Sequence, residues 1–229
     1  MVRIDRRFRG PPDSGNGGYS CGLLAAALGG SDVEVTLKLP PPLDRELAIV
    51  VDGDEARMMD GDTLVAEARR RTVDLDVPSP PSLAEAGAAE AHYTGQVNHI
   101  FPTCFVCGPD RDPGDGLCIF PGAIGDQVAA AWTPAHSLTG VDGMLKPEFV
   151  WAALDCPGIF AVEAAARPAV LGRFAVHLVD RAIAPQPLVV TGWEIASEGR
   201  KHRAGTALHS ADGTLLAFGE ATWITLRES

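Results

Sequence analysis

Two segments of the chain are apolar on nearly every side, and both predict buried helices. Tyr19 to Leu28 is rich in Ala and Leu, and Gly29-Gly30 ends it as glycines commonly end helices. Pro147 to Cys156 begins with a proline, which suits the first turn of a helix, and we expect Pro157-Gly158 to stop it. A helix without a polar face must be covered by other elements.

The other apolar positions predict an extensive sheet. Val33 to Leu39 alternates apolar and polar residues with period two, which is typical of a strand with one solvent-facing side. β-Branched and aromatic residues favour strands at 174–179 and 221–226. The predicted strands are residues 2–9, 33–39, 47–51, 55–59, 63–70, 127–133, 170–183, 188–196, 202–209 and 215–226.

One hairpin pattern occurs twice. Asp60-Gly61 and Asp212-Gly213 are turn dipeptides, and each is followed by an apolar strand that passes through a Glu-Ala pair. Further strands and an Ala-rich helix precede each hairpin. Such a repeat predicts two copies of one helix-plus-sheet unit, with a site where the copies meet. We expect a first unit at 1–71, a second unit at 101–229, and a linker at 72–100 with room for a short helix.

Composition and charge narrow the classes of function. The 229 residues carry a formal net charge of −11, and a surface this acidic repels nucleic-acid phosphates. No apolar run approaches the roughly 20 residues of a membrane span, and the first residues lack the apolar region of a signal peptide. The five cysteines are odd in number and match no disulfide framework. We expect a cytoplasmic protein with reduced cysteines and neither a nucleic-acid nor a membrane partner.

The order of elements and three segments resemble a known superfamily. The segments are Gly15 to Ala27, Phe101 to Pro109 and Pro147 to Asp155. Together they resemble uncharacterised bacterial proteins grouped with the hotdog-fold acyl-CoA thioesterase superfamily, over essentially the whole chain. The resemblance implies an α+β double hotdog, in which two antiparallel sheets each wrap round a central apolar helix. It also implies an acyl-CoA or related acyl thioester as partner, and a homodimer. Because one fold hosts several functions, it does not fix the reaction.

Asp155 is the one carboxylate of the second predicted helix beyond its first turn. Its place near a helix C-terminus, among apolar residues, disfavours the charged form and raises the pKa. Such a carboxylate can act as a general base on water or attack a thioester carbonyl itself. The resembling thioesterases carry their catalytic Asp or Glu on the central helix. Trp151 shares the stripe of Asp155 and is a predicted substrate contact. The alternatives are exposure of Asp155 or a structural ion pair with Arg173 or Arg181.

The loop before the first helix predicts complementary donors. Gly15, Gly17 and Gly18 allow a ligand to approach the backbone, and first-turn N–H groups lack intrahelical acceptors. Such a helix start can hold a thioester oxygen as it becomes an oxyanion, and Asn16 adds a side-chain donor. An ordinary N-cap explains Asn16 equally well. The equivalent place in the first helix, near Ala26, has no acid, so we expect one site per chain, with donors from the first unit and the acid from the second.

Cys104 and Cys107 form a single C-x-x-C pair. A structural zinc site requires four ligands; His99 and Cys118 could complete the set, but their spacing matches no strong pattern. A cytosolic redox pair is a second interpretation. We favour two reduced cysteines near the core, because free cysteine is among the most buried residue types. No metal ion and no cofactor are therefore expected.

The segment 200–203 is a short basic cluster in an acidic chain. Its Arg200, Lys201 and Arg203 are candidates to bind the phosphates of coenzyme A. A solvated hairpin turn is the plainer interpretation of such a short charge run.

These residues lead to one principal hypothesis and two rivals. The principal hypothesis is an acyl-CoA thioesterase that binds its substrate between its halves, with Asp155 as general base or nucleophile. A non-catalytic acyl- or lipid-binding protein of the same fold is the main rival. An enoyl-CoA hydratase is less supported, because the resembling hydratases have a His shortly after the Asp, whereas Cys156-Pro157-Gly158 follows here. A serine esterase of the α/β-hydrolase type is not supported, because the chain lacks G-x-S-x-G.

Overall fold

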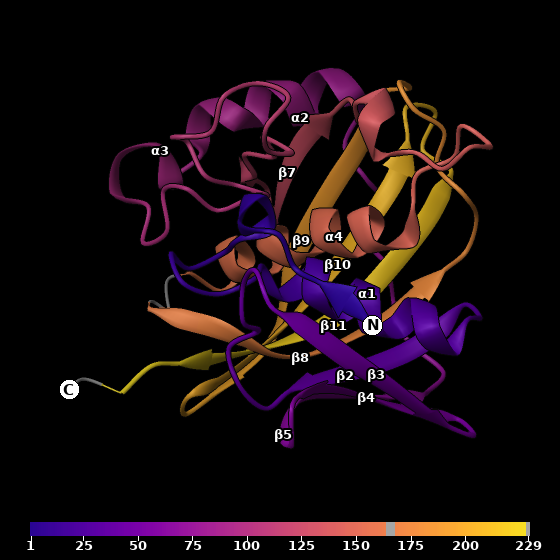
Figure 1. The fold of residues 1–229 in the computed structure, drawn as a ribbon. Helices are drawn as coiled ribbons and strands as arrows, with labels where there is room; N and C mark the ends of the chain where they lie inside the picture. The colour runs from indigo at the N-terminus through magenta and orange to yellow at the C-terminus, as the bar shows by residue number, and fades with distance from the viewer. Residues whose placement is uncertain (164–167, 228–229) are drawn as a thin grey trace.

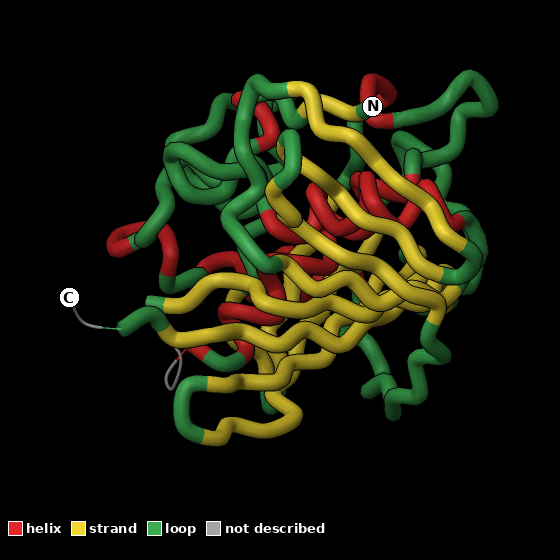
Figure 2. Tube along the Cα trace, turned by 60° about the horizontal axis from the view of Figure 1, so that its bottom comes forward, coloured by secondary structure: helices red, strands yellow, loops and turns green. Residues whose placement is uncertain are grey.

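Two buried helices lie side by side on one face of a curved sheet (Figures 1 and 2). The computed structural model describes residues 1–163 and 168–227. Helix α1 (Gly17–Leu28) packs on the first strands of the chain, and helix α4 (Pro147–Ala161) packs on the last ones. As predicted, α1 ends at Gly29, whose φ of +60° suits a glycine.

The strands of the described residues form one sheet in the order β1-β3-β4-β5-β2-β8-β11-β10-β9-β7-β6. Every neighbouring pair is antiparallel. The bounds are β1 (Val2–Arg3), β2 (Asp32–Leu37), β3 (Glu46–Asp52), β4 (Glu55–Asp60), β5 (Thr63–Arg70), β6 (Gly122–Ile124), β7 (Gln127–Trp132), β8 (Ala169–Leu178), β9 (Leu188–Glu198), β10 (Lys201–Ser210) and β11 (Leu215–Thr225).

The strand order is that of two copies joined edge to edge. From the junction outward, the first half runs β2, β5, β4, β3, β1, and the second half runs β8, β11, β10, β9, β7. The turns at Asp60-Gly61 and Asp212-Gly213 therefore occupy equivalent places, between β4 and β5 and between β10 and β11. The prediction of two separate sheets is wrong, because β2 pairs with β8, with Val35 opposite Phe174. Each half thus covers an edge of the other that would otherwise be open to aggregation.

Several predicted boundaries differ from the structure, and the strand predicted at 170–183 ends at Leu178. Only Val2–Arg3 of the predicted strand 2–9 is extended, and a 3-10 turn, η1 (Arg6–Phe8), follows it. Helix α4 continues through Pro157 and Gly158 to Ala161. A Cβ at Gly158 would lie 2.9 Å from Trp223 Nε1, so this glycine allows the sheet to approach the helix closely. Tertiary packing here overrides the local stop signal.

The segment 72–100 contains the predicted short helix. Helix α2 (Leu83–Ala89) begins with a capping box between Ser82 and Glu85, and it packs on β7. The short elements η2 (Glu90–His92), α3 (Gly95–Asn98) and, later, η3 (His136–Leu138) complete the secondary structure. In the described part of the chain, no helix has the length and apolarity needed to cross a membrane.

Two glycines bring the central helices together. A Cβ at Gly18 would lie 2.5 Å from the carbonyl oxygen of Trp151 and 2.6 Å from the Cβ of Asp155. A Cβ at Gly22, one turn later, would lie 2.6 Å from the Cα of Glu148. The backbones of α1 and α4 therefore approach so closely that only glycine fits, and the start of α1 faces Asp155.

Candidate active site

Asp155 lies at this helix crossing and is 2% exposed. Its Oδ2 accepts two hydrogen bonds, from the Gly18 N–H at 2.9 Å and from Asn16 Nδ2 at 2.8 Å. Its Oδ1 has no hydrogen-bond partner among the described residues. Asp155 also lines a cavity. One carboxylate oxygen is therefore held in place, and the other is buried without a partner among the described residues.

The pKa of Asp155 is raised to about 7, mainly by burial and in smaller part by the nearby Cys104, although the hydrogen bonds from Gly18 and Asn16 oppose the rise. The carboxyl group thus changes its charge near neutral pH. The alternatives expected for Asp155 are wrong, since it is not exposed and neither arginine binds it. Arg173 donates to Thr36, and Arg181 pairs with Asp142.

Asn16 uses both ends of its side chain. Its Oδ1 accepts from the Tyr19 N–H at 2.9 Å, which caps α1, and its Nδ2 donates to Asp155. The Gly15 N–H donates to the carbonyl oxygen of Pro41. The expectation that Gly15, Asn16 and Gly18 supply oxyanion donors is therefore corrected: these donors already bind other groups of the protein. Gly17, whose first-turn N–H has no intrahelical acceptor, remains at the cavity wall.

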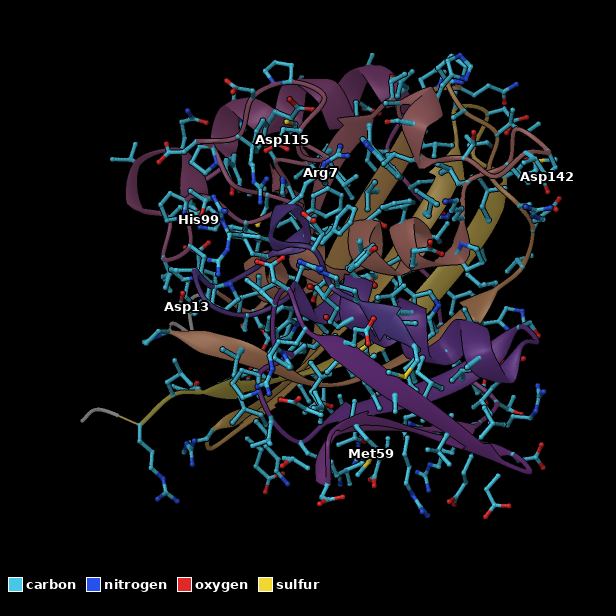
Figure 3. The ribbon with its side chains drawn as sticks, in the orientation of Figure 1. Arg7, Asp13, Met59, His99, Asp115 and Asp142 are labelled. Atoms are coloured by element: carbon cyan, nitrogen blue, oxygen red, sulfur yellow. The ribbon has the colours of Figure 1, made fainter. Side chains whose placement is uncertain are left out.

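The cavity has a volume of about 660 Å³ and is mainly apolar. Both halves of the chain contribute to its wall, through the segments 10–17, 37–41, 99–107, 155–160, 169–172 and 223–226. Asp13 and His99, which both line it, lie on the same side of the molecule (Figure 3). Trp151 is not among the lining residues, contrary to prediction. It packs edge-on against Phe174 in the core, because its turn of α4 faces α1 and the sheet.

Trp223 is a cavity residue that the sequence did not reveal. It is 5% exposed, and its Nε1 has no hydrogen-bond partner in the parts of the chain that are described. It lies against Gly158, one helical turn from Asp155. It is also opposite Leu171 in the β8–β11 pair, and Leu171 contacts Gly17. Only the pairing of distant strands brings this indole near the carboxylate, so no local signal could have shown it.

Three thiols gather at the cavity wall. Cys104 and Cys107 are buried, as the favoured interpretation requires, and Cys156 of α4 joins them. The three Sγ atoms lie within 4.8 Å of one another, which is within reach of one metal ion. Cys118 belongs neither to this group nor to the cavity wall. Cys156 could have been suspected only from its place beside Asp155.

The basic cluster lies beside the cavity and not in its wall. Arg200 Nε donates to the Thr225 carbonyl oxygen at 2.9 Å, and Lys201 is opposite Ile224, which lines the cavity. Arg203 Nε binds Glu220 Oε1 at 2.7 Å, so its charge is largely compensated. Of the three predicted phosphate ligands, Arg203 is therefore the one already engaged by a carboxylate.

Comparison with known proteins identifies the fold. No family model and no curated protein sequence matches the chain. A solved structure of a provisionally assigned thioesterase from Novosphingobium aromaticivorans matches with a TM-score of 0.64 and 12% identity, over 99% of this chain and 94% of that one. The tesB protein of Mycobacterium avium subsp. paratuberculosis matches with a TM-score of 0.60 and 14% identity, over 95% and 89%. A provisionally assigned oleoyl thioesterase from Lactobacillus plantarum matches with a TM-score of 0.60 and 11% identity, over 99% and 95%.

The chain shares its fold with solved structures that are named as thioesterases. The expected resemblance is confirmed at this level, and the matches span nearly the full length of both chains. At such low identity a hotdog-like thioesterase fold carries no residue roles with it, so the chemistry has to be argued from the geometry around Asp155.

Proposed function

We propose that the protein hydrolyses an acyl thioester, such as an acyl-CoA, with Asp155 as the general base. One observation carries the proposal: Asp155 lines an apolar cavity, with one carboxylate oxygen anchored by Gly18 and Asn16 and the other buried without a partner among the described residues. A base is most effective when its pKa lies near the working pH, and the pKa of Asp155 is about 7. The hotdog-like fold is shared with structures named as thioesterases.

In the proposed reaction, Oδ1 of Asp155 takes a proton from a water molecule as the water oxygen attacks the thioester carbonyl. The developing oxyanion is proposed to accept hydrogen bonds from the Gly17 N–H and from Trp223 Nε1, whose residues line the same cavity. When the tetrahedral intermediate collapses, the C–S bond breaks and the departing thiolate takes the proton from Asp155. The products are a carboxylic acid and a thiol. Direct attack by Asp155, through an acyl anhydride, is the alternative route.

The surroundings suggest which part of the substrate lies where. The mainly apolar cavity suits a fatty or small aromatic acyl group. Arg200 and Lys201, beside the cavity-lining Ile224, are proposed to meet the phosphates of coenzyme A. Arg203 contributes less, because it is paired with Glu220.

We further propose that the two halves are two hotdog units, at 1–71 and 101–229, joined by the linker 72–100. The equivalent strand order on either side of the β2–β8 junction supports this division. A cytoplasmic location and a homodimer are also proposed. Sedimentation equilibrium tests the homodimer, and a concentration-independent monomer mass would exclude it.

Thiol release from a panel of acyl-CoAs tests the proposed activity, with Asp155→Asn as the matched variant. We expect turnover by the wild type on at least one chain length. We expect Asp155→Asn to bind the same acyl-CoA with similar affinity and to lose about 10²- to 10⁴-fold in kcat, the usual contribution of a general base. Binding without turnover in the wild type would instead support the non-catalytic acyl-binding protein.

A further inference from the structure

The thiols of Cys104, Cys107 and Cys156 lie close enough together to bind a single soft metal ion. Cys104 Sγ and Cys156 Sγ are 3.8 Å apart, and Cys107 Sγ is 2.9 Å from Cys156 Sγ, too far for a disulfide bond of about 2.05 Å. Thiolates bound to zinc at about 2.3 Å in a tetrahedron lie about 3.8 Å from one another. Cys104 and Cys156 already have this spacing, and Cys107 Sγ would have to move away from Cys156 Sγ to reach it. At most 4% of each cysteine is exposed, so these sulfurs are shielded from competing solvent.

Backbone hydrogen bonds and a tight turn fix the conformation of the C-x-x-C segment. The backbone N–H groups of Val106 and Cys107 donate to Cys104 Sγ, which is the hydrogen bonding that a thiolate needs. Gly108 follows in a turn so tight that a Cβ would lie 2.5 Å from the Cys104 nitrogen and 2.5 Å from the Pro102 carbonyl oxygen. No other residue fits there without moving the backbone.

A buried arginine fixes the same loop from outside. Arg111, 9% exposed, donates through Nε to the Thr103 carbonyl oxygen at 2.8 Å and through its guanidinium to the Arg7 carbonyl oxygen at 2.7 Å. The loop is therefore rigid next to the cluster. Rigid support of this kind is typical of built metal sites.

His99 is placed to donate a hydrogen bond to Cys107 Sγ. Its Nε2 is 3.2 Å from Cys107 Sγ, while its Nδ1 accepts the Phe101 N–H at 2.9 Å. Because Nδ1 uses its lone pair on Phe101, the neutral imidazole carries its proton on Nε2 and donates it to the Cys107 sulfur. His99 then stabilises a thiolate and does not supply a fourth ligand.

We propose that Cys104, Cys107 and Cys156 bind one zinc ion as three thiolate ligands, and that the fourth position is filled from the cavity by water or a ligand. All three cysteines contribute to the cavity wall, as does Asp155. Thiolates select zinc among the common cellular divalent ions, and three protein ligands with one open position are typical of a reactive zinc site. Metal binding is measured without substrate, so the zinc proposal can be tested whether or not the protein hydrolyses thioesters.

Metal analysis of untagged protein, purified from zinc-supplemented cells, tests the site. We expect one equivalent of zinc in the wild type and in Cys118→Ser, whose thiol lies outside the cluster, and little in Cys104→Ser or Cys156→Ser. Cobalt in place of zinc should give thiolate-to-metal charge-transfer absorption with the intensity of three thiolates. We expect His99→Gln to hold zinc about 10- to 100-fold more weakly, the usual effect of removing a group that orients a ligand. Complete loss of zinc from this variant would overturn the donor role of His99.

Native mass spectrometry of the wild type tests the site even if a cysteine variant does not fold. We expect a mass increase of one zinc that a chelator removes. A wild type that carries no metal, and that binds neither zinc nor cobalt after full reduction, would overturn the proposal. So would a mass two hydrogens below that of the reduced chain, with the cross-link mapped to Cys107 and Cys156.

Discussion

Gly18 and Asp155 are joined in two ways at the crossing of the central helices. The Gly18 N–H donates to Asp155 Oδ2 at 2.9 Å, and a Cβ on Gly18 would lie 2.6 Å from the Cβ of Asp155. The glycine thus lets the helices approach and also anchors the carboxylate. A larger residue at this position would push Asp155 away from its donor. The close packing of α1 on α4 and the position of the Asp155 carboxylate therefore both depend on Gly18.

Gly18→Ala is expected to reduce stability by about 1–3 kcal/mol, the usual effect of overpacking a core, and to lower thioester hydrolysis with it. The matched control is Gly87→Ala in α2, where the nearest contact of an added Cβ is 3.8 Å away, at Ala131. Since alanine favours helices, this control should be neutral or more stable by up to about 1 kcal/mol. Urea unfolding measures both, and equal stabilities for the two variants would contradict the close crossing.

The raised pKa of Asp155 also predicts how stability depends on pH. Between its ordinary value of 3.8 and its folded value of about 7, the folded state keeps a proton that the unfolded state releases. The free energy of unfolding of the wild type therefore falls as pH rises through this window, by about 1.4 kcal/mol per pH unit. Asp155→Asn should not show this loss. Urea midpoints measured from about pH 5 to pH 8 should show the variant gaining on the wild type. Parallel curves would mean that Asp155 titrates normally.

The sequence predicted most helices and strands and the burial of Asp155. It predicted the contacts between distant elements less well. The apolar helices, the repeated hairpin turns and the strand alternation are local signals, so they could be read directly. The β2–β8 pairing that merges the sheets has no local signature, because each strand could equally have formed an edge. The approach of Trp223 and Cys156 to the cavity depends on that same tertiary arrangement. Asn16 and Gly18 were expected to donate to a bound thioester, and in the structure they donate to Asp155 instead.

Arg200 and Lys201 are expected to act on substrate binding alone. Replacing both with Gln should raise KM for acyl-CoA without changing kcat, because the phosphates are remote from the thioester. Arg57→Gln, on strand β4 of the other half, is the control for losing one positive charge away from the cavity, to be compared with Arg200→Gln and Lys201→Gln singly. Acyl-N-acetylcysteamine thioesters, which lack phosphate, should show no effect of the double change. An equal rise of KM for both substrates would place the phosphates elsewhere.

Trp223→Phe removes the indole N–H and keeps an aromatic ring in the core. If Nε1 holds the oxyanion, kcat should fall about 10²- to 10³-fold, with little change in KM. Circular dichroism and urea unfolding establish that the variant is folded. A folded variant with wild-type kcat would remove Trp223 from the reaction and leave Gly17 as the proposed donor.

The pH dependence of kcat/KM for acyl-CoA hydrolysis tests the role of Asp155 most directly. We predict that the rate of the wild type rises with pH through an apparent pKa near 7, as the carboxylate loses its proton and becomes a base. We also predict that Asp155→Asn, folded and able to bind acyl-CoA, shows no such rise. Hydrolysis by the variant at the wild-type rate and with the same pH profile would contradict the account.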